Sequence, residues 1–152
     1  MNDENPIRAT FIFFPPVDDA TAWNLRLEDL AQRIEHAFPG SSTNLEGELG
    51  PRPSPALSFE VQVADGLWLE GLATTPFEGM GSVLLYNALA DEAAVFAAWL
   101  RDSFAPSPGL VHFSSEMALN NGDESVWRVP EAGGLEAITA ELQRHVDAAE
   151  QL

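Results

Sequence analysis

Residues 57–75 read LSFEVQVADGLWLEGLATT, and the alternation in this stretch decides the fold. Apolar and polar side chains alternate on each side of Asp65–Gly66, which is the pattern of half-buried β-strands. A three-residue loop over residues 64–66, with glycine in the left-handed conformation, fits the junction. The stretch therefore predicts an antiparallel hairpin.

The hairpin loop sets the register. It pairs Val63 with Leu67, and beyond them it pairs Gln62 with Trp68, Val61 with Leu69, and Glu60 with Glu70. A two-residue loop would instead oppose Val61 to Glu70 and mix the two faces, so burial favours the first register. One face is then apolar (Phe59, Val61, Val63, Leu67, Leu69), and the other carries Glu60, Gln62, Trp68 and Glu70.

The rest of the chain predicts an α+β domain. Helical periodicity marks residues 18–38, which Asp18 or Asp19 can cap, residues 91–104, capped by Asp91, and residues 131–152. Strands are expected at residues 8–16, 82–88, 110–116 and 125–130, with an edge strand near residues 45–49.

Consecutive strands favour antiparallel pairing, and one-sided helices must cover a sheet face. We expect a two-layer sandwich in which three helices cover one face of a mainly antiparallel sheet of about five or six strands. Its order of elements resembles a ferredoxin-like core. The apolar run FIFFPP, residues 11–16, should lie inside the sheet, because an exposed apolar edge invites aggregation.

Charge is the unusual feature of the composition. The chain has 24 acidic residues against seven basic ones, all arginine, and a net charge of −17. Such a chain repels nucleic-acid phosphates and anionic membranes, so we expect it to bind neither. A basic protein partner is favoured, because the acidic field would steer its approach. The alternative is that the charge serves solubility alone.

Length and composition predict one domain over residues 1–152, with residues 1–6 as a disordered tail. The absence of cysteine excludes disulfides and thiol chemistry. No apolar run reaches the roughly 20 residues that span a bilayer, and acids precede the first arginine, unlike a signal peptide. We expect a cytoplasmic protein, and the arginine-only, alanine-rich composition suggests a bacterial source.

No motif predicts a cofactor. A phosphate-binding P-loop needs a lysine, which this chain lacks, and GMGS at residues 79–82 lacks the third glycine of a dinucleotide fingerprint. In SSEMALNNGDESVW, residues 114–127, a calcium loop with Gly122 sixth would start at Met117 and end at Arg128, neither of which ligates calcium. We interpret this stretch as an acidic turn whose Glu116, Asp123 and Glu124 add negative charge to one end of the sheet.

Two carboxylates opposed across a strand pair, Glu60 and Glu70, destabilise the hairpin. One carboxyl can keep a proton, an arginine can bridge the two, or the face can await a cationic partner. Trp68 beside them would be an exposed anchor for an interface. The alternative is that another segment covers this face and Trp68 joins a second small core.

The histidines offer a second kind of site. His36 and His145 are expected near helix C-termini, where the helix dipole favours a cation. On an extended strand His112 would share a face with Ser114 and Glu116, a pattern that suits a metal ligand set or a general base, with Glu60 or Glu70 as a further ligand. A solvated strand face has the same spacing.

We therefore hypothesise a non-enzymatic acidic binding protein. Its size, charge and lack of cysteine resemble those of immunity proteins, which neutralise basic toxins such as nucleases. It would act as a monomer or weak dimer, because a net charge of −17 opposes self-association of an acidic face. The expected contact residues are Glu60, Gln62, Trp68, Glu70, His112, Ser114, Glu116, Asp123 and Glu124. The alternative is an enzyme or a metal- or small-molecule-binding domain with its site between the 40–56 loop and the strand of His112, where His112 and Glu116 act.

Overall fold

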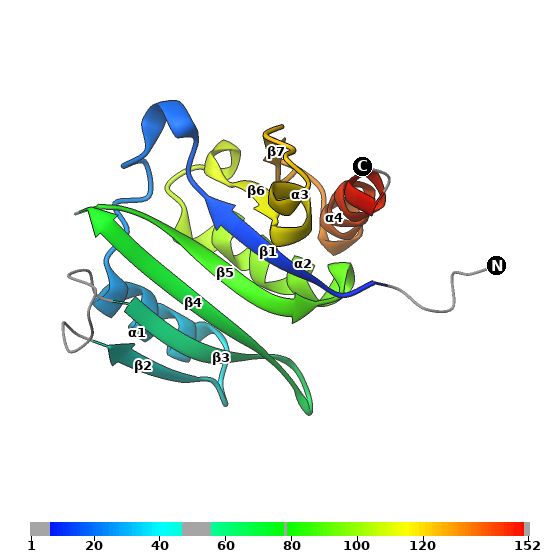
Figure 1. Cartoon of the computed structure of the whole chain (residues 1–152). Coiled ribbons are helices and arrows are strands. Elements are labelled where there is room, and N and C mark those ends of the chain that lie inside the picture. Colours follow the sequence, from blue (N-terminus) through cyan, green and yellow to red (C-terminus); the bar gives the residue numbers. More distant parts are fainter. Residues whose placement is uncertain (1–6, 47–55, 78, 151–152) are drawn as a thin grey trace.

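The computed structural model describes residues 7–46, 56–77 and 79–150. Within them the strands form one antiparallel sheet of seven strands in the order β2-β3-β4-β5-β1-β6-β7 (Figure 1). The expected α+β class is confirmed, and the sheet has seven strands in place of five or six. The strands are β1 (Ala9–Phe14), β2 (Ser42–Glu46), β3 (Ala56–Ala64), β4 (Leu67–Phe77), β5 (Met80–Ala88), β6 (His112–Ser115) and β7 (Trp127–Arg128).

Three long helices pack against one face of this sheet, as predicted (Figure 1). They are α1 (Leu27–Ala37), α2 (Ala90–Trp99) and α4 (Leu135–Glu150). The short α3 (Glu116–Asn120) packs against β1 and α4, and α2 continues into a π-helical turn, η2 (Leu100–Phe104). No helix in residues 7–46, 56–77 and 79–150 is long and apolar enough to cross a bilayer.

Strand pairing departs from the ferredoxin-like expectation. Every pair in the sheet is antiparallel, including the central β1–β5 pair. A βαβ crossover joins parallel strands, so that arrangement is missing from the described sheet. The resemblance is therefore confined to the order of elements along the chain.

The β3–β4 hairpin has the predicted register except at its tip. Glu60 faces Glu70, Val61 faces Leu69 and Gln62 faces Trp68. Ala64, however, faces Leu67, so the predicted Val63–Leu67 pair is wrong and Val63 is an extra residue in β3. A β-bulge of this kind increases the local twist and lets a tight turn coexist with the register that burial requires. Gly66 has the expected positive φ, 72°.

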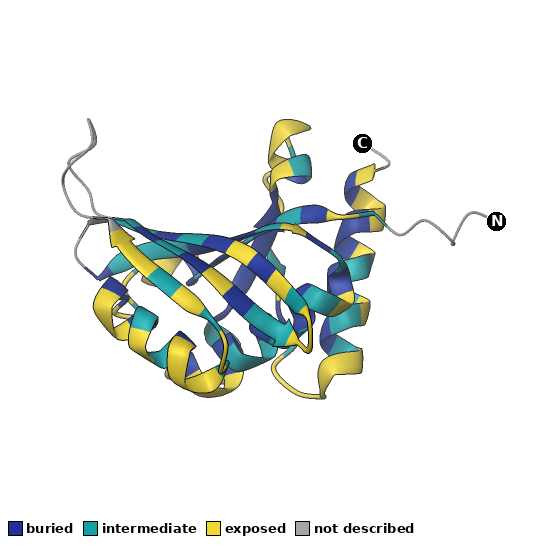
Figure 2. Ribbon diagram, turned by 90° about the horizontal axis from the view of Figure 1, so that it is seen from below, coloured by how far each residue is buried: buried dark blue, intermediate teal, exposed yellow. Residues whose placement is uncertain are grey.

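Aromatic residues fill the core between the sheet and the helices. Phe96 of α2 stacks on Phe59 of β3, with ring centroids 5.8 Å apart. Phe11 and Phe13 are fully buried on β1, which lies inside the sheet as predicted. The outer sides of the helices remain exposed, and exposed and buried residues alternate along the strands (Figure 2).

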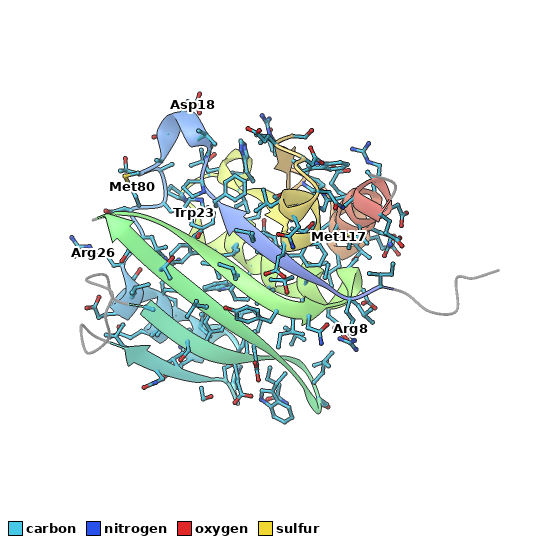
Figure 3. All side chains as sticks on the ribbon, in the orientation of Figure 1. Arg8, Asp18, Trp23, Arg26, Met80 and Met117 are labelled. Carbon is cyan, nitrogen blue, oxygen red and sulfur yellow. The ribbon has the colours of Figure 1, made fainter. Side chains whose placement is uncertain are left out.

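The segment before α1 is not α-helical, so the prediction of one helix from residue 18 to 38 is wrong at its start. Asp18 and Asp19 lie in a 3-10 turn, η1 (Val17–Asp19), and Figure 3 shows Asp18 on this protruding turn, well apart from Arg26. Trp23 is nevertheless buried, because its Nε1 donates to the Leu110 carbonyl oxygen at 2.7 Å. A satisfied indole N–H lets the ring enter the core without a helix around it.

Three further boundaries differ from the predictions. The N-cap of α2 is Leu89, whose N–H donates to Glu92 Oε1, so Asp91 lies in the first turn and is not the cap. Residues 116–120 form α3, where a turn was expected. The edge strand spans residues 42–46, and residues 47–49 of the prediction, like the tail at 1–6, lie outside the described residues.

Candidate functional site

The sheet face opposite the three long helices is the candidate site, called here the open face. Cross-strand pairs lie on the same face of a sheet, so the register defines its residues. One row across the open face consists of Asn44, Ser58, Leu72, Leu84, Ile12 and Ser114, from β2 to β6. The buried apolar residues of the three long helices form one core cluster with Phe59, Leu85 and Phe113, which lie on the other face.

Glu60 and Glu70 form an acid pair on the open face, as predicted. They are opposed in register, and both side chains are exposed. Among the ion pairs of the described residues, none includes either carboxylate. No arginine of the described residues therefore bridges the two carboxylates.

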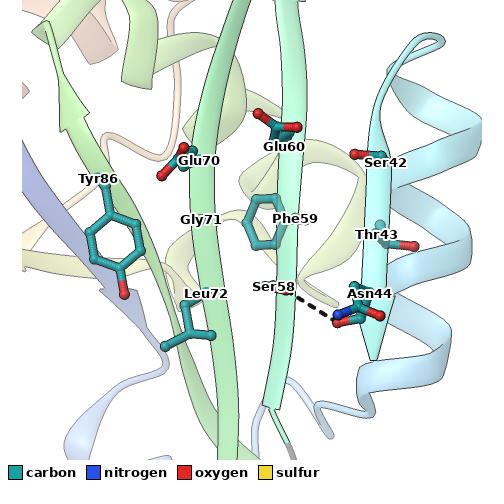
Figure 4. Close-up of a pocket in the computed structure, with 10 residues that line it drawn as sticks. All are labelled: Ser42, Thr43, Asn44, Ser58, Phe59, Glu60, Glu70, Gly71, Leu72 and Tyr86. Atoms are coloured by element: carbon teal, nitrogen blue, oxygen red, sulfur yellow. Dashed lines mark hydrogen bonds between the residues drawn. The ribbon is translucent and has the colours of Figure 1, made fainter. Parts of the chain in front are cut away.

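A pocket of about 410 Å³ surrounds the acid pair (Figure 4). Ser42, Thr43 and Asn44 of β2 line one side, and Tyr86 of β5 lines the other. Leu72 and the backbone at Gly71 form part of its wall. The acid pair and the hydroxyl groups around it make this pocket rich in hydrogen-bond acceptors.

Trp68 stands beside the acid pair on β4, with 48% of its surface exposed. Its Nε1 donates to the carbonyl oxygen of Gly40 at 3.2 Å, which ties the ring to the turn before β2. Gly40 has a φ of 94°, a conformation that residues with a Cβ rarely adopt, so this turn favours glycine. Trp68 is thus an exposed aromatic ring held in one orientation.

Sequence reasoning missed the apolar centre of the open face. Leu72, Leu84 and Ile12 are opposed in register across β4, β5 and β1, and all three are half-buried. Tyr86 and Phe14 extend this apolar row on β5 and β1 and are also half-buried. The signal was present in FIFF and SVLLY, where apolar residues occupy both strand faces, the composition of a strand covered on both sides.

His112 and Ser114 lie on the open face, as predicted, but both are buried, with 8% and 4% of their surface exposed. The His112 ring packs edge-on against Phe14, at 6.3 Å between centroids. Within the described residues His112 Nδ1 and Ser114 Oγ have no hydrogen-bond partner. Burial, followed by the charge of Arg128 on β7, lowers the pKa of His112. These two residues are enclosed, so they do not offer a contact surface to a partner in this conformation.

Glu116 does not share a strand face with His112, so that part of the metal or general-base hypothesis is wrong. β6 ends at Ser115, whose hydroxyl caps α3, and Glu116 is the first residue of the helix. Glu116 instead lines a polar groove of about 400 Å³ with Arg8, Thr10 and Asn87. In the described part of the chain no three His, Asp or Glu side chains are placed to hold a metal ion.

Asp123 and Glu124 lie in the connection between α3 and β7. Asp123 Oδ1 accepts from the Ser125 N–H at 2.8 Å, and the Ser125 hydrogen bonds lower the pKa of Asp123. These acids are far from the acid pair: β4 and β6 are three strand spacings apart, about 14 Å. The predicted contact residues therefore form two separate groups, with Glu60, Gln62, Trp68 and Glu70 together in one.

His145 is not at a helix C-terminus, so its predicted role is wrong; α4 continues to Glu150. It is buried, and its Nε2 lies 2.8 Å from Ser115 Oγ, which also accepts from the Ala118 N–H. Burial lowers the pKa of His145, while Asp123 and Glu141 act in the opposite direction. Both side chains are sealed from solvent, so the pair joins β6 to α4 and has no access to a substrate. His36 lies in the last turn of α1, as predicted.

Comparison of this chain with protein-family models, with curated proteins and with solved structures finds no match.

Proposed function

We propose that this protein is a non-enzymatic binding protein that engages a basic protein through the open face. The observation that supports the proposal is the exposed acid pair, Glu60 and Glu70, opposed across β3 and β4 without a cation from the described residues. Opposed like charges destabilise a strand pair, and a cation supplied by a partner removes that repulsion.

The surroundings of the acid pair resemble a protein–protein interface in composition. Trp68 supplies an exposed aromatic side chain whose hydrogen bond to Gly40 reduces the entropy lost on binding. The apolar row of Leu72, Leu84 and Ile12 supplies area that is favourable to remove from water. The net charge of −17 accelerates encounter with a basic surface.

The partner class that size and charge favour is a bacterial toxin with a basic active cleft, such as a nuclease. A cleft that binds phosphates is positively charged, and an acidic face of suitable shape can occupy it. In this role the protein is an inhibitor: stoichiometric addition abolishes the toxin's activity, and the inhibition weakens as salt rises.

The test begins with affinity capture from the native host and continues with the purified captured protein. We expect a basic partner whose affinity falls at least about 100-fold for the double variant Glu60→Arg and Glu70→Arg, as expected when two attractive contacts become repulsive. Trp68→Ala should cost about tenfold or more, which is the lower limit for an interface anchor.

The matched control is Asp147→Arg with Glu150→Arg. Both residues are exposed on the last turns of α4, in the helix layer away from the open face, and the pair changes net charge by the same amount. Arginine is also compatible with a helix C-terminus. Equal losses in the two double variants would show that only overall charge matters, and an unchanged affinity of the Glu60 and Glu70 variant would remove the proposal.

A further inference from the structure

The acid-pair pocket has a shape and lining that select among cations. The carboxylates accept hydrogen bonds, and the hydroxyls of Ser42, Ser58 and Tyr86 can accept as well. Asn44 contributes an amide at the β2 side, where its backbone oxygen already accepts from Ser58 Oγ at 3.4 Å. These groups come from four adjacent strands, so the sheet holds them in place before a ligand arrives (Figure 4).

The spacing of the acid pair suits one planar cation. Directly opposed residues in an antiparallel pair have Cβ atoms about 5 Å apart, so the carboxylates of Glu60 and Glu70 are close enough for one cation to contact both. A guanidinium has five N–H donors in a rigid plane, and two of its edges can donate to different carboxylates at once. The group can therefore neutralise Glu60 and Glu70 together.

The walls of the pocket favour the same group over an ammonium of equal charge, because the two cations differ in hydration and in stacking on aromatic rings. Tyr86 stands on the strand next to Glu70, with its ring along the pocket, and Leu72 lies below it (Figure 4). Guanidinium is weakly hydrated and stacks on aromatic rings, whereas the ammonium of lysine is compact and strongly hydrated. Entering a half-apolar pocket therefore costs an arginine side chain less desolvation free energy than it costs a lysine side chain.

We propose that the acid-pair pocket is a receptor for an arginine side chain of the partner, bound between Glu60 and Glu70 and stacked on Tyr86. This inference rests on the proposed function and states which chemical group of the basic partner the open face recognises.

The test uses Nα-acetyl-arginine amide as the probe and Nα-acetyl-lysine amide, which keeps its side-chain ammonium, as the comparison. Each is titrated into the ¹⁵N-labelled full chain at about 0.15 M salt, where the Debye length is about 8 Å. We expect saturable shifts of the amide signals of Ser42, Glu60, Glu70 and Tyr86, with the arginine probe binding at least threefold more tightly than the lysine probe. Equal affinities of the two probes would overturn the inference.

Variants separate the pocket from the general acidity of the chain. Glu60→Gln with Glu70→Gln should weaken the arginine probe at least tenfold, and Tyr86→Leu should remove its preference over lysine. The control Asp147→Asn with Glu150→Gln should leave the affinity unchanged. Unchanged binding in the Glu60 and Glu70 variant would also overturn the inference.

Failure of this inference and failure of the proposed function give different results. If the partner loses affinity for the Glu60→Arg and Glu70→Arg variant while the two probes bind equally, the function stands and the arginine receptor does not. If the arginine probe binds as described while the captured partner is indifferent to that variant, the receptor stands and the proposed partner surface does not.

Discussion

On β3 and β4 the polar side chains Glu60 and Glu70 are exposed to solvent, whereas the polar side chains of β6 are buried. Ser115 is fully buried and has two hydrogen-bonding contacts, to His145 and to the Ala118 N–H. Ser114, on the other face of the same strand, is also buried but has no partner among the described residues. The comparison teaches that alternation decides which face a side chain takes, while neighbouring elements decide whether that face meets water.

The largest effect on stability is expected at Gly71, below the acid-pair pocket. A Cβ there would lie 2.2 Å from Phe59 Cζ and 2.8 Å from the Leu84 carbonyl oxygen. Gly71→Ala should therefore lower the free energy of unfolding by about 3 kcal/mol, because the core ring and the neighbouring strand must both shift. Urea denaturation measures the change.

A second glycine serves as the control for Gly71. Gly66 lies at the hairpin tip with φ of 72° and no atom within 4 Å of a Cβ. Asparagine tolerates this conformation, so Gly66→Asn should cost less than about 1 kcal/mol. Similar losses at both positions would contradict the close packing of Phe59 against β4.

Ser115 and Ser114 test the enclosed end directly. Ser115→Ala removes the cap of α3 and leaves His145 Nε2 unpaired, so we expect a loss of about 2 kcal/mol. Ser114→Ala removes a buried hydroxyl that has no partner in the described residues, so stability should stay the same or rise. Thermal and urea unfolding measure the change in stability of each variant. A larger loss for Ser114→Ala than for Ser115→Ala would contradict the hydrogen bonds described.

The pH dependence of stability sharpens the same contrast. Burial lowers the pKa of both His112 and His145 in the folded protein, so below about pH 6.5 the unfolded chain binds more protons than the folded one. The free energy of unfolding should therefore fall as pH drops from 7 through 6.5 and below, until the buried imidazoles themselves take up protons. Unfolding measured at several pH values checks this slope.

Histidine variants show whether His112 and His145 cause this pH dependence of stability. His145→Gln and His112→Gln should each make stability less dependent on pH between about 7 and 5.5, whatever their effect at pH 7, because each removes one titrating group. A slope that is the same in the native chain and in both variants would assign the pH dependence to other groups.

A small gain in stability is expected at the acid pair. Glu60→Gln with Glu70→Gln removes the repulsion between two exposed carboxylates and should raise the free energy of unfolding by about 0.5 kcal/mol. The gain should shrink at high salt, which screens exposed charges. A loss of stability would mean that the carboxylates make favourable contacts within the folded chain, which would weaken the case for a partner.

The hairpin was predictable because its pattern is local. Alternation over residues 57–75 identified the faces, the Glu60–Glu70 pair and the exposed Trp68, and the glycine in the loop marked the turn. The bulge at Val63 was missed, since a one-residue bulge leaves the alternation on either side intact. The helix starts were also missed, because Asp18, Asp19 and Asp91 are good N-caps by residue type. In the structure η1 has no side-chain cap, and at α2 the Glu92 side chain accepts from the N–H of the N-cap Leu89.

The pocket and the enclosed histidines were beyond local patterns. Tyr86 lies beside Glu70 only because β5 pairs with β4, and Ser42 lies beside Glu60 only because β2 joins the edge of β3. His145 and Ser115 are 30 residues apart and meet because α4 packs over β6. The acidic charge led only to the hypothesis of a basic partner, and the pocket that we propose as its binding site could not be located without the sheet order.

By itself, the sequence determined the two faces of the β3–β4 hairpin outside its tip, the apolar sides of the long helices and the opposed acid pair, since these depend on periodicities of two and 3.6 residues that need no distant neighbour. Only the tertiary structure decided which strands lie side by side, which polar groups of the open face are sealed, and where a pocket forms. Burial and pocket geometry arise from contacts between segments far apart in the chain, and one-dimensional periodicity carries no information about those contacts.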